Sequence, residues 1–306
     1  MEYFAKSDIG NYRKQNEDFY WCGNGLFIVA DGMGSHTAGE VASKLAVESF
    51  VKFFLPEINK FKTYKKNKKH KIKHKNEIKE SNKDKSRQLN HAAAESAYNA
   101  ESNFLSKYNL EHGLKPELKT QIENFENIKI DSETIKEILT SSIRYSNKEV
   151  YNLSIKKHQY SGMGTTFTGC FINSGVANIV HVGDSRVYIN HQKKLKLVTS
   201  DHTVVGEMYR NGLITYEEMF RHPLRNYLNN VLGLSAEVAA DFITCSITDD
   251  DILVLCTDGL NSMLKDNEIE AIINKFKEPQ KITEKLILSA NKKGGFDNTT
   301  IITVLI

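Results

Sequence analysis

The chain has few cysteines and no long apolar run, and each shortage excludes a class of protein. The four cysteines among its 306 residues are widely spaced and form no Cys-x-x-Cys pair; they are Cys22, Cys170, Cys245 and Cys256. This usage argues against a disulfide framework and predicts free, buried thiols in a reducing cytoplasm. No apolar run reaches the ~18 residues that suggest a membrane span. Residues 1–6 also lack the basic start and apolar stretch of a signal peptide, so we expect a cytoplasmic protein.

Acidic residues are scarce in one segment, where lysine dominates. Residues 56–87 contain 13 Lys or Arg against 4 Asp or Glu, a net charge of +9; the whole chain has +3, so the remainder has −6. The segment has almost no apolar periodicity, which predicts a mobile, solvated insertion. Few aromatic side chains interleave its lysines, so a nucleic-acid partner is not favoured, while an acidic protein partner stays open.

Four aspartates lie where strand-like segments give way to turns or are about to begin. Asp31, Asp184 and Asp258 follow apolar runs and stand beside a glycine, and Asp297 follows a Gly-Gly-Phe turn. A single aspartate in such a place is usually a turn former or a helix cap. Four of them predict carboxylates gathered at one edge of a sheet core, where their oxygens suit Mg²⁺ or Mn²⁺.

Short motifs extend in a fixed order from the N-terminus to the last strand-like segment. Together they are specific, although none is decisive alone; they are Ser7-Asp8-Ile9-Gly10, Arg13-Lys14-Gln15-Asn16-Glu17-Asp18, Asp31-Gly32-Met33-Gly34, Gly164-Thr165-Thr166, His181-Val182-Gly183-Asp184-Ser185-Arg186, Asp258-Gly259-Leu260 and Asp297-Asn298-Thr299-Thr300. With these motifs the sequence resembles the PP2C family of metal-dependent protein serine/threonine phosphatases, and its bacterial branch in particular. The motifs reach across the whole chain except about residues 56–160.

The resemblance implies two divalent cations, Mn²⁺ or Mg²⁺, and it assigns their ligands. Asp31 would bridge the two ions, with the carbonyl of Gly32 on one of them, and Asp258 and Asp297 would hold the second. Two such ions can bridge and activate a water and clamp the oxygens of a phosphate monoester. Asp184 matches a third-metal carboxylate of bacterial members; it can equally cap the turn to Arg186, and both interpretations stay open.

Three residues near the N-terminus complete the implied site. Arg13 matches the family's phosphate clamp, because a guanidinium fork fits phosphate oxygens geometrically. Glu17 and Asp18 match residues that hydrogen-bond to metal-bound waters and orient them. Without the other motifs, Arg13 reads as surface charge and Glu17 with Asp18 as a solvated turn.

Two residues near Asp31 depart from the family pattern. Ser35 replaces the second glycine of a bacterial Gly-Gly-His motif, which does little harm unless the backbone needs a positive φ there. Met33 stands where eukaryotic members carry a histidine proposed as general acid. His36 is a nearby alternative acid, because histidine titrates near neutral pH. A histidine at a helix start is as often structural, and water can serve instead.

Hydrophobic periodicity predicts an α+β fold in which strands bracket a helical middle. Strand-like segments cover residues 2–7, 18–22, 26–30, 165–172, 176–182, 186–190, 239–245, 252–257 and 300–306. Helical spacing covers residues 39–55, 89–108, 130–157, 267–276 and 281–291. This order favours an antiparallel α+β sandwich over an alternating fold. The resemblance implies the same: a central antiparallel β-sandwich flanked by pairs of helices.

We expect residues 1–306 to form one PP2C-like domain with two added features. Residues 56–130 exceed what the helices expected there would use and form an insertion, of which 56–87 is the lysine-rich part. Residues 205–225 resemble the family's flap, in which two short helices flank Asn211-Gly212. Such a loop on a rigid scaffold would govern substrate access.

The main functional hypothesis is metal-dependent hydrolysis of phosphoserine and phosphothreonine in proteins, by a monomer that opposes a bacterial Ser/Thr kinase. A pseudophosphatase that binds phosphoproteins without turnover is the alternative. Inactive members usually lose a ligand carboxylate, whereas Asp31, Asp258 and Asp297 are all present. A third hypothesis, a nucleic-acid-associated protein that uses the basic insertion, predicts strongly salt-dependent binding.

Overall fold

The computed structural model describes residues 1–34, 38–74, 130–219 and 221–306, with side chains left out for 62–74. The chain divides into two compact units, one of Met1–Lys62 with Asn124–Ile306 and one of Thr63–Glu123. His36, the helix predicted at 89–108 and most of the insertion predicted at 56–130 lie outside the described residues.

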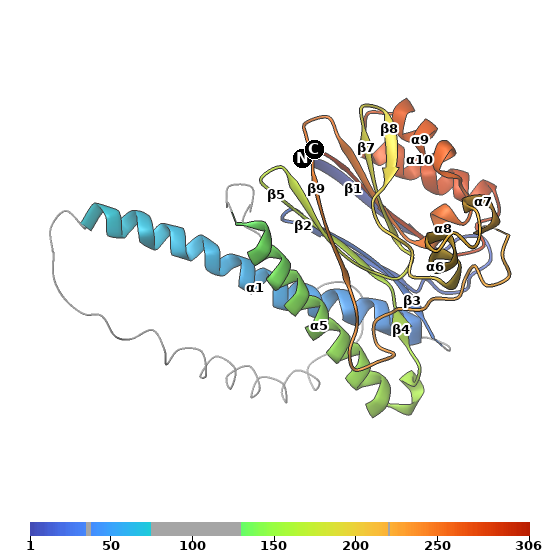
Figure 1. The fold of residues 1–306 in the computed structure, drawn as a ribbon, viewed down its shortest axis with the longest axis horizontal. Coiled ribbons are helices and arrows are strands. Elements are labelled where there is room, and N and C mark those ends of the chain that lie inside the picture. Colours follow the sequence, from blue (N-terminus) through green and yellow to red (C-terminus); the bar gives the residue numbers. More distant parts are fainter. Residues whose placement is uncertain (35–37, 75–129, 220) are drawn as a thin grey trace. The chain divides into compact units, whose positions relative to one another are not determined.

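Two antiparallel sheets form the centre of this unit (Figure 1). The first sheet has the strand order β1 (Glu2–Asp8), β11 (Thr299–Leu305), β10 (Ile252–Cys256), β7 (Arg186–His191) and β8 (Lys194–Leu197). The second has the order β2 (Asp18–Gly23), β3 (Leu26–Met33), β5 (Phe167–Asn173), β6 (Val176–Val182) and β9 (Asp241–Ser246), with β4 (Gly164–Thr165) paired to β3. The two termini lie side by side, since β1 pairs with β11 along its whole length.

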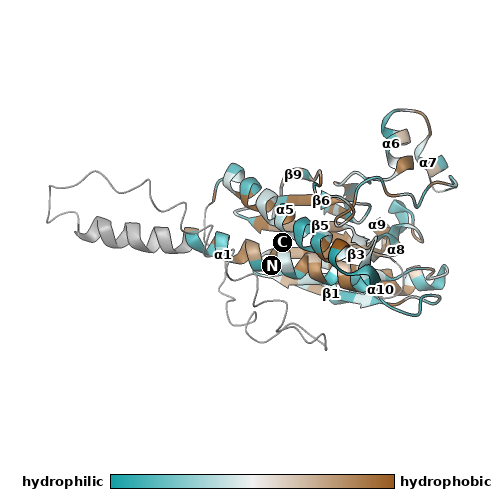
Figure 2. Cartoon of the chain, turned by 90° about the horizontal axis from the view of Figure 1, so that it is seen from below, coloured by the Kyte–Doolittle hydropathy of each residue, from teal (hydrophilic) through white to brown (hydrophobic). Residues whose placement is uncertain are grey.

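The inner strands β5, β6 and β10 are mainly apolar because each sheet is covered on both faces, whereas the edge strands β1, β8 and β9 are partly exposed. One core cluster lies between the sheets and joins Phe27, Val29 and Ile179 of the second sheet to Leu253 and Ile302 of the first. Figure 2 shows this apolar character along β5 and β6. Runs with apolar residues at every position are expected where both faces of a strand are buried. The predicted strands thus become the interior of a sandwich.

Helices cover the outer face of each sheet. Those on the first sheet are α9 (Asp266–Lys275) and α10 (Pro279–Lys292), whose Ile273 and Leu286 pack on Val254. Those on the second are α1 (Ala38–His74) and α5 (Ser132–Lys156). There the Phe50 ring of α1 lies 4.7 Å from that of Phe167. The α+β sandwich flanked by helix pairs, predicted from the sequence, is confirmed.

The remaining helices are short and lie at the loops of the sandwich. They are η1 (His158–Tyr160), α6 (Val204–Arg210), α7 (Tyr216–Met219) and α8 (Asp258–Asn261). α6 and α7 lie within the segment predicted as a flap. The helices in the described part of the chain include no candidate for a membrane span.

Three elements differ from the prediction. Helix α1 continues from the predicted end near Leu55 to His74. Lysine and glutamate are good helix formers even without an apolar stripe, so periodicity alone ended the helix too early. β8 has only four residues and was missed for that reason, and Asp258 begins the short helix α8 where a turn was expected.

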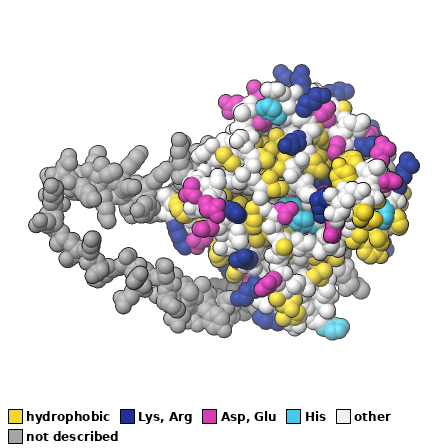
Figure 3. All heavy atoms as spheres, viewed as in Figure 1, with side chains coloured by type: hydrophobic (Ala, Val, Ile, Leu, Met, Phe, Trp, Pro, Cys, Tyr) yellow, Lys and Arg dark blue, Asp and Glu magenta, His cyan; other side chains and the backbone are white. Residues whose placement is uncertain are grey.

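The predicted free thiols are confirmed, and their burial is partly as expected. All four cysteines are free; Cys170 and Cys256 are buried, whereas Cys22 and Cys245 are half-buried. Burial raises the pKa of the Cys170 thiol. The exposed charges of the body are mixed in sign on the face seen in Figure 3. Its net negative charge is therefore not displayed there as one continuous acidic surface.

Candidate metal and phosphate site

The register of the second sheet places two carboxylates opposite each other. Asp18 at the start of β2 and Asp31 near the end of β3 are direct partners in this antiparallel pair. Side chains of directly opposed strand residues lie about 5 Å apart on one face, and like charges there repel. Two carboxylates held in this way need a compensating proton or cation.

Asp18 is buried and joined to the first sheet by two threonines. Its Oδ2 atom accepts hydrogen bonds from Thr257 Oγ1 at 2.9 Å and from Thr300 Oγ1 at 2.7 Å. Burial raises the pKa of Asp18 to about 7; the two hydrogen bonds oppose the rise, and the charge of Asp258 adds to it. The side chain therefore ties β2 to the ends of β10 and β11.

Asp31 and Asp258 are half-buried and sense the charges of the same group. Burial first, and then the charges of Asp18, Asp258 and Asp184, hold the pKa of Asp31 well above its usual value. Burial and Asp297 raise the pKa of Asp258 to about 6, while a hydrogen bond with Asp31 opposes the rise. The aspartates predicted from separate motifs are thus brought together by the fold.

Unpartnered oxygens in this group are suited to divalent cations. Within the described residues, the buried atoms Glu17 Oε1, Asp18 Oδ1 and Asp258 Oδ1 meet no hydrogen-bond donor. Such atoms cost free energy, and hard cations take carboxylate oxygens as ligands. Among the described residues, no three Asp, Glu, His or Cys side chains already surround one ion position. The fit to divalent cations rests on the negative charge of the group and on these unpartnered oxygens.

Arg13 contacts one of the predicted metal ligands. Its Nη2 atom donates to Asp297 Oδ2 at 2.6 Å, and the two side chains are 46% and 28% exposed. Glu17 is half-buried near this pair; burial raises its pKa, and the charge of Arg13 opposes the rise. The guanidinium therefore lies at the exposed rim of the carboxylate group.

Gly32 lies where the main chain passes against two other segments. A Cβ atom here would lie 2.0 Å from the carbonyl oxygen of Gly39 and 2.7 Å from that of Glu17. Gly32 N also donates to Glu17 O at 3.1 Å. Close backbone packing at the start of α1 requires glycine at this position, whether or not an ion approaches its carbonyl.

We expect Gly32→Ala to lower the free energy of unfolding by about 3 kcal/mol, because the added methyl group meets backbone atoms that cannot rotate away. Gly162→Ala is the matched control. Its Cβ would meet nothing within 4 Å, so only its φ of +77° is unfavourable, at about 1–2 kcal/mol. Urea denaturation of both variants measures the difference. Equal losses would contradict the packing role of Gly32.

Asp184 lies close to the group but makes no contact that decides between its two predicted roles. Burial and the charges of Asp258 and Asp201 raise its pKa well above the usual value. Asp184 and Asp258 line the same cavity of about 80 Å³. Asp201, for which the sequence indicated no role, accepts two hydrogen bonds from Arg186, at 2.9 and 2.6 Å.

The sequence analysis did not assign a role to Asn298, whose side chain links the loops around the site. Asn298 Nδ2 donates to the carbonyls of Ile9 and Gln15, each at 3.0 Å. Its Oδ1 accepts from Glu17 N at 2.9 Å. The signal was present, because Asn298 belongs to the motif that contains Asp297, but its role depends on contacts with the distant N-terminal loop.

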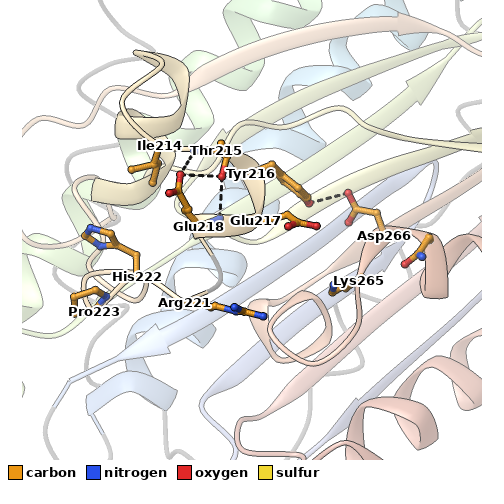
Figure 4. Close-up of a pocket in the computed structure, with 11 residues that line it drawn as sticks. Ile214, Thr215, Tyr216, Glu217, Glu218, Arg221, His222, Pro223, Lys265 and Asp266 are labelled. Atoms are coloured by element: carbon orange, nitrogen blue, oxygen red, sulfur yellow. Dashed lines mark hydrogen bonds between the residues drawn. The ribbon is translucent and has the colours of Figure 1, made fainter.

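The segment predicted as a flap lines a pocket beside α9 (Figure 4). The pocket has a volume of about 780 Å³ and is lined by Ile214–Glu218, Arg221–Pro223 and Lys265–Asn267. Tyr216 OH of α7 donates to Asp266 Oδ2 at 2.8 Å across it, and Tyr188 OH of β7 donates to Asp266 Oδ1 at 3.0 Å. In the same segment Met219 is only 8% exposed, whereas Tyr209 is 46% exposed.

Comparisons with known proteins identify the family of the chain. A family model described as "Protein phosphatase 2C" matches residues 15–294. "Serine/threonine phosphatase stp" of Listeria monocytogenes serotype 4b is 28% identical over 98% of this chain and 93% of its own length. "Protein phosphatase PhpP" of Streptococcus pneumoniae serotype 2 is 26% identical over 99% of this chain and 97% of its own length.

Solved structures extend the comparison to the fold. The serine/threonine phosphatase of S. agalactiae aligns with a TM-score of 0.71 and 26% identity, covering 100% of this chain and 99% of its own. The catalytic domain of the phosphatase PstP, solved with two manganese ions, aligns with a TM-score of 0.66 and 24% identity, covering 99% and 96%. The second likeness supports the fold alone.

Proposed function

This chain belongs to the protein phosphatase 2C family, and we propose on that premise that its carboxylate group holds the divalent cations of a protein serine/threonine phosphatase. The enzyme is metal-dependent and acts on phosphoproteins. The observation that carries the placement of the site is the convergence of Asp18, Asp31 and Asp258, whose pKa values are all raised by burial and by neighbouring carboxylates.

We assign Asp31, Asp258, Asp297 and the carbonyl of Gly32 as ligands of two Mn²⁺ or Mg²⁺ ions, and Asp184 as the carboxylate of a third. When bound, the ions supply positive charge against the phosphoryl oxygens and a water of lowered pKa. The unpartnered oxygens of Asp258, Asp18 and Glu17 support this assignment. Asp18 and Glu17 hold and orient water molecules at the site, because each keeps a free carboxylate oxygen there.

Arg13 is the proposed phosphate clamp. Its guanidinium stays charged at any working pH, and its forked donors match phosphoryl oxygens. In this structure Arg13 is paired with Asp297, which is a proposed metal ligand. Binding of the ions and of the substrate would therefore break the Arg13–Asp297 ion pair. His36 lies outside the described residues, and its role as general acid stays a prediction.

The deciding assay is phosphate release from p-nitrophenyl phosphate and from a phosphothreonine peptide, with Mn²⁺, with Mg²⁺ and after chelation. We expect release with either metal and its loss on chelation. A pseudophosphatase would bind the phosphopeptide but release no phosphate under any of these conditions. That result would contradict the proposed activity while leaving the fold and family unchanged.

Arg13→Ala should raise KM for a phosphopeptide about tenfold or more, with a smaller fall in kcat. Substrate and transition state both carry phosphoryl charge, so the guanidinium contributes to the binding of both. Lys14→Ala, at the exposed neighbouring residue, is the control for loss of positive charge in the same loop. An unchanged KM in Arg13→Ala, measured from initial rates, would exclude the clamp role.

Finer proposals concern the substrates, the assembly, the domain organisation, the compartment and a partner of this protein. We propose substrates phosphorylated by a bacterial Ser/Thr kinase, a monomeric enzyme, and one catalytic domain interrupted by residues 56–130. The four free thiols support a reducing cytoplasm. The +9 charge of residues 56–87 supports contact with an acidic protein partner, which salt would weaken.

A further inference from the structure

An exposed aromatic pair lies directly beside the carboxylate group. Tyr12 and Phe296 are 68% and 54% exposed, although their rings lie 4.9 Å apart and contact each other. Each is the residue immediately before a member of the Arg13–Asp297 ion pair. Ile9, in the same loop as Tyr12, is also exposed, at 40%. We call Ile9, Tyr12 and Phe296 the aromatic platform.

The two loops that carry the platform are held together by several hydrogen bonds. Asn11 N donates to Gly295 O at 2.7 Å, and Asn11 Nδ2 donates to the carbonyls of Asn291 and Gly294, each at 2.8 Å. Gly10 lies so close to the second loop that a Cβ atom would lie 2.4 Å from the carbonyl oxygen of Asp297. The platform is therefore a built surface and not a pair of loose side chains.

The platform contributes nothing to the sandwich core, although its side chains are large and apolar. Single exposed apolar residues are common and need no explanation, but a held group of them marks a contact surface. Aromatic side chains on rigid backbone are efficient contact residues, because little conformational entropy is lost when a partner binds. The position beside Arg13 indicates which partner this is.

We propose that the aromatic platform binds an apolar side chain next to the phosphorylated residue of the substrate, so that the enzyme prefers phosphoserine or phosphothreonine flanked by apolar residues. The inference rests on the proposed function, since Arg13 must receive the phosphate. An extended peptide rises about 3.3–3.6 Å per residue, and its side chains alternate between two faces. Tyr12 and Phe296 directly precede Arg13 and Asp297 in the chain, so a side chain one or two positions from a phosphoryl group held by Arg13 lies over the loops that carry these rings.

The alternative contact surface is the segment that follows residues 205–225, where Tyr227 is 62% exposed. Tyr227 provides a matched control, because it is an exposed tyrosine of the same unit that takes no part in the platform. If that segment alone contacts the flanking residues, Tyr227→Ser changes the preference and Tyr12→Ser does not. The platform predicts the reverse.

The test compares two phosphothreonine peptides that differ only at the residues flanking phosphothreonine, which are leucine in one and glycine in the other. We expect kcat/KM of the wild-type enzyme with Mn²⁺ to favour the leucine peptide about tenfold, as partial burial of an aliphatic side chain allows. Tyr12→Ser and Phe296→Ser should each reduce this ratio towards one. Tyr12→Phe, which keeps the ring, should retain it.

A binding measurement separates failure of this inference from failure of the proposed function. The same two peptides carrying a non-hydrolysable phosphonate are titrated by fluorescence anisotropy, which requires no turnover. Preference for the leucine peptide, lost in Tyr12→Ser and kept in Tyr227→Ser, supports the platform even if no phosphate is released. Equal affinity for both peptides in the wild type overturns it, and so does a preference that depends on Tyr227.

Discussion

The Asp31→Asn variant is expected to lose at least about 10³-fold in phosphate release while staying folded. Burial and the negative charges of nearby aspartates raise the pKa of Asp31; the nearby aspartates are Asp18, Asp258, Asp184 and Asp297. An amide of the same shape removes one negative charge from this group. The variant without metal should therefore melt no lower than the metal-free wild type, because repulsion is relieved.

Three measurements on Asp31→Asn make the prediction specific. Phosphate release from p-nitrophenyl phosphate at saturating Mn²⁺ should be lost, and the rise in Tm on adding Mn²⁺ should be lost with it. Asp249→Asn, at an exposed aspartate, is the control and should behave like the wild type. Activity within about tenfold of the wild type would remove Asp31 from the metal site.

Metal affinity should fall steeply as the pH is lowered from 7.5 to 5.5. In the metal-free protein the pKa of Asp18 is about 7 and that of Asp258 about 6. Protons therefore oppose cation binding in this range, directly at the proposed ligand Asp258 and through the neighbouring Asp18, and metal binding releases them. One to two displaced protons would raise the apparent Kd for Mn²⁺ by about 10- to 100-fold over the interval.

The stability of the metal-free protein should change in the opposite direction. A carboxyl whose pKa is raised by folding opposes folding when it is ionised, so its penalty decreases as the pH falls from 8 towards 5. The metal-free Tm should therefore hold or rise over this range, while the gain from Mn²⁺ shrinks. Differential scanning at constant ionic strength, with and without Mn²⁺, measures both. A gain from Mn²⁺ that is constant with pH would contradict protonation of the site.

Local signals in the sequence were enough to locate most of the sandwich strands along the chain. β6 begins and ends at the predicted residues, and most other predicted strands differ by one or two residues at an end. Apolar runs bounded by glycine turns indicate these strands, because a strand that is buried on both faces has apolar residues at nearly every position. Helix α1 was predicted too short because its extension depends on helix propensity and not on an apolar stripe.

The identities of the proposed ligands were also readable, since each aspartate lies in a short motif of its own. The sequence could not place Asp18 opposite Asp31, because that depends on strand register. Nor could it join Asp18 to Thr300, a hydrogen bond across 282 positions of the chain. The pKa values depend on these contacts, so they too became available only with the fold.

The residue types at the strand ends can be read directly from the sequence, and they identify the family and the class of chemistry. Three contacts required the folded chain: Arg13 pairs with Asp297, Asn298 binds the N-terminal loop, and Tyr12 contacts Phe296 on the surface. Periodicity and motifs depend only on residues that are near each other in the sequence. Contacts between residues hundreds of positions apart arise only when two sheets pack and bring their loops to one edge.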